Sequence, residues 1–461
     1  MTIVQESRRL CRRMLNPLCD FVNVLTCPFV RYTIPRMTFM QTDIFDILES
    51  RGYIYQCTNL EKVKEMLGTG KPMTFYLGID PTADSLHIGH FFALMMFRYL
   101  QDAGHHGVLL IGGATALVGD PSGKSDIRKM LTKEHVQKNL EEVTELAKRF
   151  VRVDGDNPVV IRNNADWINQ ESYVDFMRNV GVHFNVNTML QAEAYANRLK
   201  SGGLTFLEMG YMLMQAYDFV YLNRHHDCVL QIGGSDQWGN IVAGTALYRK
   251  MKFIDDKENN KESREEIFGL TCPLLLTKDG NKMGKTEQGT LWVARDKTTP
   301  YDFYQYFYNV EDENVEMLLK LFTRLNLPEI STLCSSDILS AKKTMAYEIT
   351  ALVHGKDEAD KVLTAVSSLF GNESNLENVP TAEVSASDIG NGILLVDLMA
   401  LVGFLPSKSE GRRMVTQSAI TLDGQKITDV NCLVSQSDFD KGYIIIKRGK
   451  KNFIKITVSD S

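Results

Sequence analysis

Short hydrophobic runs and longer hydrophobic segments alternate along the first part of the chain, and glycine-rich or polar stretches separate them. The short runs predict buried strands, whereas a long apolar segment without Gly or Pro predicts a helix. We expect strands at residues 73–77, 107–113, 159–161, 228–234 and 270–277. Residues 91–100 predict a buried helix between the first two strands, and this order favours a parallel sheet.

Helical patterns and a polar break divide the rest of the chain. We expect helices within residues 43–51, 59–67, 130–150, 167–200 and 300–370, and a charged surface loop at 255–266. Residues 371–387 are polar and lack periodicity, which is typical of a linker. The predicted organisation is an α/β domain at 40–290, an α-helical domain at 291–372, a linker at 373–390 and a small α+β domain at 391–461.

The composition is that of an ordinary globular protein. Of the 461 residues, 44% are hydrophobic and 23% are charged. No uninterrupted apolar run approaches the roughly 20 residues that a membrane span needs, so we expect no membrane contact. The eight cysteines form no CxxC pair and no Cys/His ligand spacing, which argues against a zinc site or a disulfide framework.

Charge is unevenly distributed along the chain. Residues 1–39 hold six arginines and two acids, and four of the arginines come in pairs among apolar residues. This composition predicts a mitochondrial targeting segment, and therefore a location in the mitochondrial matrix, although a functionless tail would share it. Residues 391–461 are also basic, while the whole chain carries −6. Any nucleic-acid contact must therefore come from local basic patches.

Two histidines follow the first predicted strand, in the order His87-Ile88-Gly89-His90. The free N–H groups and the dipole of a helix that starts there form an anion site. Two imidazoles three residues apart lie on one side of the first turn and can donate hydrogen bonds to a phosphate. Gly89 would let a flat ring pack against the backbone. The four residues alone also fit ordinary core or surface histidines.

A lysine-rich loop, residues 278–286, follows the last predicted strand. A mobile loop with lysines can close over a triphosphate and stabilise its transition state, although a plain basic hairpin turn has the same composition. A further stretch, residues 119–125, looks like a phosphate-binding loop. It lacks the first glycine of the GxxxxGK[ST] pattern, so a true P-loop is not expected.

A polar stripe follows one otherwise apolar predicted helix. Tyr211, Gln215 and Asp218 lie at i, i+4 and i+7 and therefore share one face. Burying an acid, an amide and a phenol without partners would cost several kcal/mol. The stripe therefore belongs to a buried network or lines a small polar pocket. A ligand with an amino group, a carboxylate and a phenol would satisfy it.

Together, the histidine and lysine motifs resemble the HIGH and KMSKS signatures of class I aminoacyl-tRNA synthetases, the second present as Lys282-Met283-Gly284-Lys285-Thr286. Further motifs narrow the resemblance to tyrosyl-tRNA synthetases of the bacterial and organellar type, over about residues 40–461. They lie at residues 76–86, 112–115, 119–123, 211–218 and 231–240. Gly284 departs from the serine that many relatives in this enzyme class carry, which leaves the lysines as the main phosphate contacts.

The resemblance implies a Rossmann-like catalytic domain with a dimerising insertion, a helical anticodon-binding domain and a homodimer formed through apolar helices at about 180–207. It implies L-tyrosine, ATP with substrate-borne Mg²⁺, and tRNA(Tyr) as ligands, with no dedicated metal. Tyrosine would be activated to tyrosyl-adenylate and transferred to the 3′ end of the tRNA in mitochondrial translation. No general base is needed, because the tyrosine carboxylate attacks and pyrophosphate leaves, so catalysis is positioning plus electrostatics.

The resemblance also assigns roles to individual residues. The implied catalytic residues are Thr82, His87, His90, Lys282 and Lys285. ATP would contact Gly78, Asp80, Gly89, Gly234 and Asp236, with the two lysines at its β/γ end. Tyr76 and Asp218 would meet the substrate phenol, Tyr211, Gln215 and Asp120 its ammonium group, and Gln231 and Gln237 its amino and carboxylate groups. Phenylalanine would be rejected because it leaves buried polar groups unpaired.

The C-terminal segment resembles an S4-type RNA-binding domain, with a short helix pair followed by a hairpin that turns at Asp423-Gly424. Lys408, Arg412 and Arg413 are the implied tRNA contacts, because basic residues on a helix edge suit phosphates. On charge alone, an ordinary basic α+β module fits slightly better, and the resemblance reverses that preference.

Three other functions share some of these features. The tryptophan enzyme has the same fold, but Tyr76 with Asp218 favours a phenol over an indole. A small-molecule nucleotidyltransferase would not need the C-terminal module or the lysine loop. A non-catalytic RNA-binding or splicing protein would not need the histidines and lysines, although an added RNA role stays open.

Overall fold

The structure is a computed structural model that describes residues 43–122, 130–259, 266–276, 282–286, 289–370, 380–390, 392–449 and 452–459. The predicted targeting segment, residues 1–39, lies outside the described residues. Within the described part, no helix is both long enough and apolar enough to cross a membrane.

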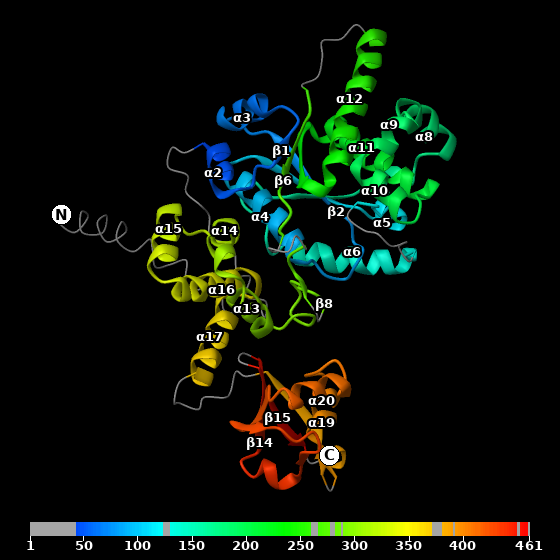
Figure 1. The fold of residues 1–461 in the computed structure, drawn as a ribbon. Coiled ribbons are helices and arrows are strands. Elements are labelled where there is room, and N and C mark those ends of the chain that lie inside the picture. Colours follow the sequence, from blue (N-terminus) through cyan, green and yellow to red (C-terminus); the bar gives the residue numbers. More distant parts are fainter. Residues whose placement is uncertain are drawn as a thin grey trace, which may run out of the picture. The chain divides into compact units, whose positions relative to one another are not determined.

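A six-stranded sheet forms the centre of the first domain, in the order β1-β6-β5-β2-β3-β4 (Figure 1). The strands are β1 (Gln56–Cys57), β2 (Thr74–Ile79), β3 (His106–Ile111), β4 (Val160–Asn163), β5 (Cys228–Gly234) and β6 (Phe268–Cys272). All neighbours pair in parallel except β1, which is antiparallel to β6. The predicted α/β class and parallel sheet are confirmed, and the strand order reverses direction between β2 and β5.

Strand β2 extends further than its sequence predicts. Gly78 was expected to end the strand, but Gly78 and Ile79 still pair with Leu110 and Ile111 of β3. A Cβ at Gly78 would meet nothing within 4 Å, so its neighbours do not require a glycine. Pairing with β3 outweighs the local preference of glycine for a turn. The loop therefore starts at Asp80.

Long helices cover the sheet. Helix α4 (Ile88–Asp102) follows β2, and α12 (Trp238–Asn259) follows β5. The chain runs from β2 through α4 to β3, toward one edge of the sheet, and from β5 through α12 to β6, toward the other edge. Right-handed crossovers in opposite directions place α4 and α12 on opposite faces of the sheet (Figure 1). The loop expected at 255–266 is wrong for its first residues, since α12 continues to Asn259.

Other helices of this domain are α2 (Ile44–Arg51), α3 (Leu60–Gly68), α5 (Thr115–Val118) and α6 (Lys133–Ala147). Four short helices, α7 (Ala165–Ile168), α8 (Tyr173–Asn179), α9 (Val186–Gln191) and α10 (Glu193–Ser201), separate β4 from α11 (Phe206–His226). Their apolar side chains join those of α11 and α12 in one core that includes Trp167, Tyr195 and Phe219. Helix α11 is thereby fixed beside the sheet.

Five helices make up the next region: α13 (Pro300–Tyr308), α14 (Asp312–Phe322), α15 (Leu327–Ser336), α16 (Ile338–His354) and α17 (Lys356–Phe370). This agrees with the predicted helical segment at 300–370. Pro300 occupies the first turn of α13, and the hydroxyl of Thr299 caps that helix by accepting from the N–H of Asp302.

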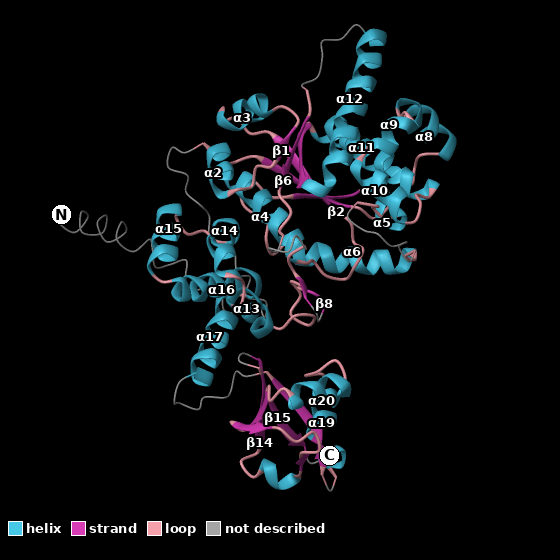
Figure 2. Ribbon diagram, viewed as in Figure 1, coloured by secondary structure: helices cyan, strands magenta, loops and turns pink. Residues whose placement is uncertain are grey.

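The C-terminal region contains a five-stranded sheet in the order β12-β11-β14-β15-β9. Figure 2 shows its strands β14 and β15 in magenta beside the helices of the region in cyan. Its strands are β9 (Thr381–Ser385), β11 (Ile420–Leu422), β12 (Gln425–Ile427), β14 (Tyr443–Arg448) and β15 (Asn452–Ser459). Helices α19 (Leu395–Leu401) and α20 (Lys408–Thr416) contribute to its core. Residues 381–385 fall in the expected linker but pair with β15, so the sheet begins before residue 391.

Candidate active site

A cavity of about 880 Å³ opens at the carboxyl ends of β2 and β5, where the strand order reverses. Ligands of such sheets bind at this switch point. The cavity brings together the residues that sequence reasoning assigned to tyrosine, ATP and catalysis. Those that line it are Tyr76, Gly78, Asp80, Thr82, His87, Gly89, His90, Asp120, Tyr211, Gln215, Asp218, Gln231, Gly234, Asp236, Gln237 and Lys282.

His87 and His90 form the first turn of α4. Nδ1 of His87 accepts hydrogen bonds from the N–H groups of Gly89 (3.1 Å) and His90 (3.3 Å), and Nδ1 of His90 accepts from the N–H of His87 (3.4 Å). Because both Nδ1 atoms accept, the hydrogen-bond network assigns the ring proton of each histidine to Nε2. Burial, with His87 beside it, holds the pKa of His90 well below 6.5. His90 is therefore a neutral hydrogen-bond donor at neutral pH.

Gly89 gives the His87 ring room to lie over this turn. A Cβ at Gly89 would stand 3.0 Å from Cε1 and 3.1 Å from Nδ1 of His87. The two imidazole rings stack with their centroids 3.7 Å apart. The glycine of the motif thus serves the geometry of the histidine pair itself.

Asp218 is a buried carboxylate held by two donors. Nδ2 of Asn164 donates to its Oδ2 at 3.0 Å, and the indole N–H of Trp167 donates to its Oδ1 at 2.8 Å. Burial raises its pKa to about 7, and these two hydrogen bonds oppose the rise. Tyr76, on β2, is also buried, and its hydroxyl has no hydrogen-bond partner among the described residues. Burial, followed by the charge of Asp218, raises the pKa of Tyr76 well above 10, so the Tyr76 hydroxyl keeps its proton.

The polar stripe of α11 faces the cavity, as the lining shows. The hydroxyl of Tyr211 donates to Oδ2 of Asp80 at 2.9 Å. Oε1 of Gln215 and Oε1 of Gln231, on β5, are buried, and neither finds a hydrogen-bond partner within the part of the chain that the structure describes. A buried amide oxygen that lacks a donor is costly. These two oxygens therefore mark places where a ligand can donate hydrogen bonds.

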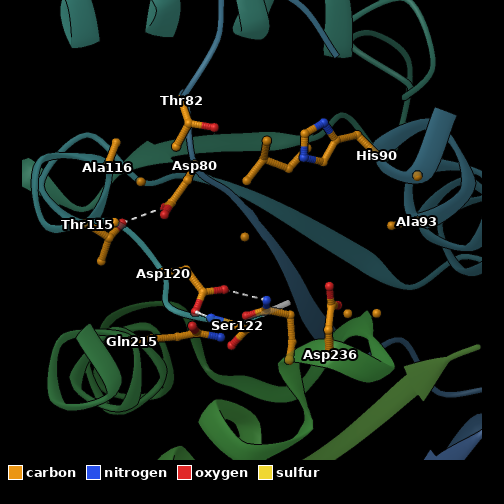
Figure 3. Close-up of a pocket in the computed structure, with 18 of the residues that line it drawn as sticks. Asp80, Thr82, His90, Ala93, Thr115, Ala116, Asp120, Ser122, Gln215 and Asp236 are labelled. Carbon is orange, nitrogen blue, oxygen red and sulfur yellow. Dashed lines mark hydrogen bonds between the residues drawn. The ribbon is translucent and has the colours of Figure 1, made fainter. Parts of the chain in front are cut away.

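Asp120 and Gln237 form a second polar pair in the cavity. Nε2 of Gln237 donates to Oδ2 of Asp120 at 2.7 Å, and the N–H of Ser122 donates to Oδ1 at 2.9 Å. Figure 3 shows Asp120, Ser122 and Gln215 grouped together, with Asp80 and Thr115 nearby and His90 and Asp236 further along the cavity wall. The carboxylate of Asp120 is thus held between the N–H of Ser122, in its own loop, and Gln237, in the turn after β5.

Asp80 is fixed at the end of β2. The hydroxyl of Thr115, at the start of α5, donates to its Oδ1 at 2.7 Å. A Cβ at Gly112 would come within 2.0 Å of that same oxygen and 2.2 Å of the Thr115 hydroxyl. Gly112 is therefore required for the close approach of the two strand ends. The N–H of Thr82 turns back to donate to the Asp80 carbonyl at 2.8 Å.

Lys282 reaches across the cavity to Asp236, and its Nζ lies 2.9 Å from Oδ2 of that residue. The described residues of the lysine motif thus lie beside the loop after β5. Lys285 begins β7 (Lys285–Thr286), and its side chain lies outside what the structure describes.

Sequence reasoning missed Thr115, Asn164 and Trp167, which donate hydrogen bonds to Asp80 and Asp218. Nδ2 of Asn164 also donates to the Thr115 hydroxyl at 3.0 Å, so Thr115 and Asn164 join Asp80 to Asp218. Asn164 directly follows β4, and Thr115 lies shortly after β3. Their position after predicted parallel strands was the available signal, because such strand ends meet at one edge of the sheet.

The predicted tRNA contacts lie on α20 but differ in their surroundings. Nη2 of Arg413 lies 2.6 Å from Oε1 of Glu410, and Nζ of Lys408 lies 3.1 Å from Oδ2 of Asp397. Arg412 is exposed, and among the described residues no carboxylate lies within 4 Å of its guanidinium. Two of the three charges are thus partly compensated within the domain.

Comparison with known families identifies the class of this protein. Residues 38–371 match the family "tRNA synthetases class I (W and Y)", and residues 372–456 match "Tyrosine--tRNA ligase SYY-like C-terminal domain". The chain therefore belongs to the class I aminoacyl-tRNA synthetases, in the tryptophan and tyrosine family. Enzymes of this class use ATP.

Individual relatives make the assignment more specific. The tyrosine–tRNA ligase of Clostridium tetani is 46% identical over 422 residues, which cover 91% of this chain and all of that protein. The truncated mitochondrial tyrosyl-tRNA synthetase of Aspergillus nidulans superposes with a TM-score of 0.62 at 30% identity, covering 72% of this chain and 95% of the other. The corresponding Coccidioides posadasii enzyme gives 0.60 at 26% identity, with coverage of 78% and 98%. The activity is that of a tyrosine–tRNA ligase.

Proposed function

We propose that the cavity binds tyrosine at Tyr76 and Asp218 and ATP at the first turn of α4, and that it joins them as tyrosyl-adenylate before transfer to tRNA(Tyr). Three buried oxygens that lack a hydrogen-bond partner in the described ranges carry this proposal: the Tyr76 hydroxyl and Oε1 of Gln215 and of Gln231. The hydroxyl calls for a partner that both donates and accepts, and the two amide oxygens call for donors. A phenol and an ammonium group supply these partners.

The phenol end of the pocket is built to recognise a hydroxyl. Asp218 cannot rotate freely, because Asn164 and Trp167 hold one oxygen each. A phenol hydroxyl would donate to this carboxylate and pair with the Tyr76 hydroxyl. Phenylalanine would fill the same space and donate no hydrogen bond to Asp218. It would also leave the buried Tyr76 hydroxyl unpaired, at a cost of about 1–3 kcal/mol. We assign the selection of tyrosine to this pair.

The ammonium end of the pocket combines charge with amide acceptors. Asp120 is held by Gln237 and the Ser122 N–H, so the orientation of its carboxyl group is preorganised. Gln215 and Gln231 add neutral acceptors, and Tyr211 lies on the same helix as Gln215. An α-ammonium group bound among these residues leaves the α-carboxylate of tyrosine as the nucleophile toward the α-phosphate of ATP.

We assign the phosphates to Thr82, His87, His90, Lys282 and Lys285, and the adenosine to Gly78, Asp80, Gly89, Gly234 and Asp236. The Nε2–H groups of the histidines would donate to phosphate oxygens as charge develops on them. ATP would enter with its own Mg²⁺. Lys282 would leave Asp236 for the β/γ-phosphates, which exchanges one anionic partner for another. No step needs a general base, because the carboxylate is already ionised.

The pocket assignment is tested by tyrosine-dependent ATP–pyrophosphate exchange. Asp218→Ala removes the carboxylate that meets the phenol, and we expect exchange to fall below detection. Asp227→Ala is a matched control, because Asp227 caps the C-terminal end of the same helix and does not line the cavity. Exchange that survives Asp218→Ala unchanged would refute the assignment of the phenol site.

The same assay can separate activation from charging of the tRNA. We assign tRNA contact to the C-terminal domain, through Lys408, Arg412 and Arg413, and anticodon contact to the helical region. Because β9 belongs to the C-terminal sheet, a deletion should start at residue 380. Removing 380–461 should spare exchange and weaken aminoacylation of tRNA(Tyr). Loss of both to the same extent would contradict this division.

We assign the protein to mitochondrial translation. The support is the paired arginines of residues 1–39 and the 30% identity to a mitochondrial enzyme. A fusion of residues 1–39 to a fluorescent protein should enter mitochondria. The same segment with Arg8, Arg9, Arg12 and Arg13 changed to Gln should not, and import of both fusions would show that the arginines do not act as a targeting signal.

We also propose that the protein forms a homodimer and that the predicted helices at about 180–207 form its interface. Large apolar side chains are exposed there: Val182 (69%), Val186 (53%), Leu199 (47%), Phe206 (70%) and Leu207 (44%). Exposed apolar residues gathered in one segment mark an interaction surface. A second copy of the same surface would cover them.

A further inference from the structure

The described part of the lysine motif, residues 282–286, is attached to the rest of the molecule through its backbone. The N–H of Met283 donates to the Leu275 carbonyl at 2.7 Å, and the N–H of Leu291 donates to the Gly284 carbonyl at 2.6 Å. The Leu291 carbonyl in turn accepts from the N–H of Ile88 at 3.3 Å. The lysine motif is thus tied to the first residue of the helix that carries the histidines.

Within this turn, Gly284 lies close to the side chain of Ile88. It has a φ of +84°, and a Cβ there would lie 2.5 Å from Cγ2 of Ile88. Both features exclude the serine that many enzymes of this class carry at the position. The turn therefore places the main chain of Gly284 directly against the histidine motif.

The N–H of Gly284 is satisfied from the helical region. It donates to the hydroxyl of Tyr306, on α13, at 2.8 Å. Tyr306 is half-buried, and burial raises the pKa of its hydroxyl while the bond from Gly284 opposes the rise. The hydroxyl is therefore neutral at physiological pH. It accepts from the backbone N–H of Gly284, a donor that does not titrate.

We propose that Tyr306 is a positioning residue for tyrosine activation: its hydroxyl fixes the Gly284 turn and thereby places Lys282 over the bound triphosphate. Lys282 stands two residues before Gly284 and already reaches across the cavity to Asp236 at 2.9 Å. Without the hydroxyl, the Gly284 N–H would face an apolar ring edge and the turn would lose one of its anchors. The inference rests on the phosphate role assigned to Lys282 above.

Tyr306→Phe tests this directly, because it removes one oxygen and keeps the ring. We expect kcat for tyrosine-dependent ATP–pyrophosphate exchange to fall about five- to tenfold, as the loss of one net hydrogen bond predicts. The KM for tyrosine should not change, because no residue of α13 is among those that line the cavity. Exchange at the wild-type kcat would overturn the proposal.

The same helix supplies a matched control. The hydroxyl of Tyr304 is buried, and it has no hydrogen-bond partner among the residues that the structure describes. A change to Phe removes it, as it does for Tyr306. Tyr304→Phe should leave kcat unchanged. An equal loss in both variants would show that any hydroxyl of α13 matters for packing, and would overturn the specific role of Tyr306.

A double-variant cycle separates positioning from general structure. In a Lys282→Ala background the residue to be positioned is absent, so Tyr306→Phe should reduce kcat less than twofold further. An unchanged five- to tenfold loss in that background would overturn the proposal. If Lys282→Ala alone leaves exchange intact, the assigned role of Lys282 fails and the inference fails with it. If Lys282→Ala lowers exchange and Tyr306→Phe does not, only the inference fails.

Discussion

The hydroxyl of Tyr211 donates to the carboxylate of Asp80 at 2.9 Å, and this bond joins the two halves of the cavity. Sequence reasoning placed Tyr211 at the ammonium group of tyrosine and Asp80 at the adenosine. The other carboxylate oxygen of Asp80 accepts from Thr115, so Asp80 is held from both sides. We therefore expect a change at Tyr211 to affect Asp80 and the end of the cavity that we propose for the nucleotide.

This relationship predicts that Tyr211→Phe weakens the use of both substrates. Hydrogen bonds to charged groups contribute about 1.5–3 kcal/mol, so the KM for ATP and the KM for tyrosine should each rise about tenfold or more. Steady-state exchange with each substrate varied in turn measures both. Tyr217→Phe is the control. Tyr217 lies on the same helix as Tyr211 but does not line the cavity, and its hydroxyl donates to Glu171. A rise in the KM for tyrosine alone would contradict the coupling.

The sequence predicted the parts of the site that depend on local pattern. His87 and His90 were placed at a helix start, and Tyr211, Gln215 and Asp218 on one helical face, because both follow from spacing along one element. The partners of these residues could not be predicted in the same way. Asn164 meets Asp218 across 54 positions of the sequence, and no periodicity within either segment encodes that meeting.

Strand β2 shows the same limit in the backbone. The local preference of Gly78 predicted a break, but its pairing with Leu110 depends on β3, a partner 32 positions away in the sequence. Tyr306 is a third case. Nothing in the pattern of α13 indicated that its hydroxyl meets the backbone of the lysine motif, because that bond depends on the turn at Gly284.

The raised pKa of Asp218 predicts that tyrosine binding depends on pH. With the pKa of Asp218 near 7, the carboxylate gains a proton as the pH falls from 8 to 6 and no longer accepts from the phenol as an anion. The affinity for tyrosine should therefore fall with a midpoint near pH 7, as measured by equilibrium dialysis. Asp218→Asn should bind weakly with no such midpoint, and a retained midpoint in that variant would assign the titration to another group.

The same shift has a definite sign for stability. The pKa of Asp218 is higher in the folded chain than the ordinary 3.8, so the folded state holds the proton more tightly. This group therefore stabilises the fold at low pH, and its contribution is lost as the pH rises from about 4 through 7.

Trp167 should set where that midpoint lies. Its indole N–H donates to Asp218 and favours the charged carboxylate, which lowers the pKa against the effect of burial. Trp167→Phe keeps an aromatic ring and removes the donor, so the midpoint of tyrosine binding should move up by about one pH unit. A pH titration of tyrosine affinity on the variant measures the shift. A midpoint that moves down would show that the indole does not stabilise the anion.

The exposed apolar segment predicts the oligomeric state. Phe206→Asp places a charge on the most exposed side chain of the proposed interface, and we expect analytical ultracentrifugation to show monomers. Leu339→Asp is the control, because Leu339 is 61% exposed but lies on α16, away from the segment 180–207. Dimers that persist in Phe206→Asp at micromolar concentration would place the interface elsewhere.

The environments of the three basic residues on α20 predict unequal contributions to tRNA binding. Arg413 and Lys408 each have a carboxylate partner within the domain, and a phosphate must compete with Glu410 or Asp397 for them. Arg412 is exposed on the same helix, so it can meet a phosphate without breaking an ion pair.

Arg412→Ala should therefore raise the KM for tRNA(Tyr) more than Arg413→Ala or Lys408→Ala does. It should also reduce the dependence of log KM on log salt by about one. Aminoacylation measured across a salt series tests the order, with ATP–pyrophosphate exchange unchanged in all three variants. Equal effects would mean that the ion pairs open at no cost when tRNA binds, and a larger effect of Arg413→Ala would place the phosphate on the other side of the helix.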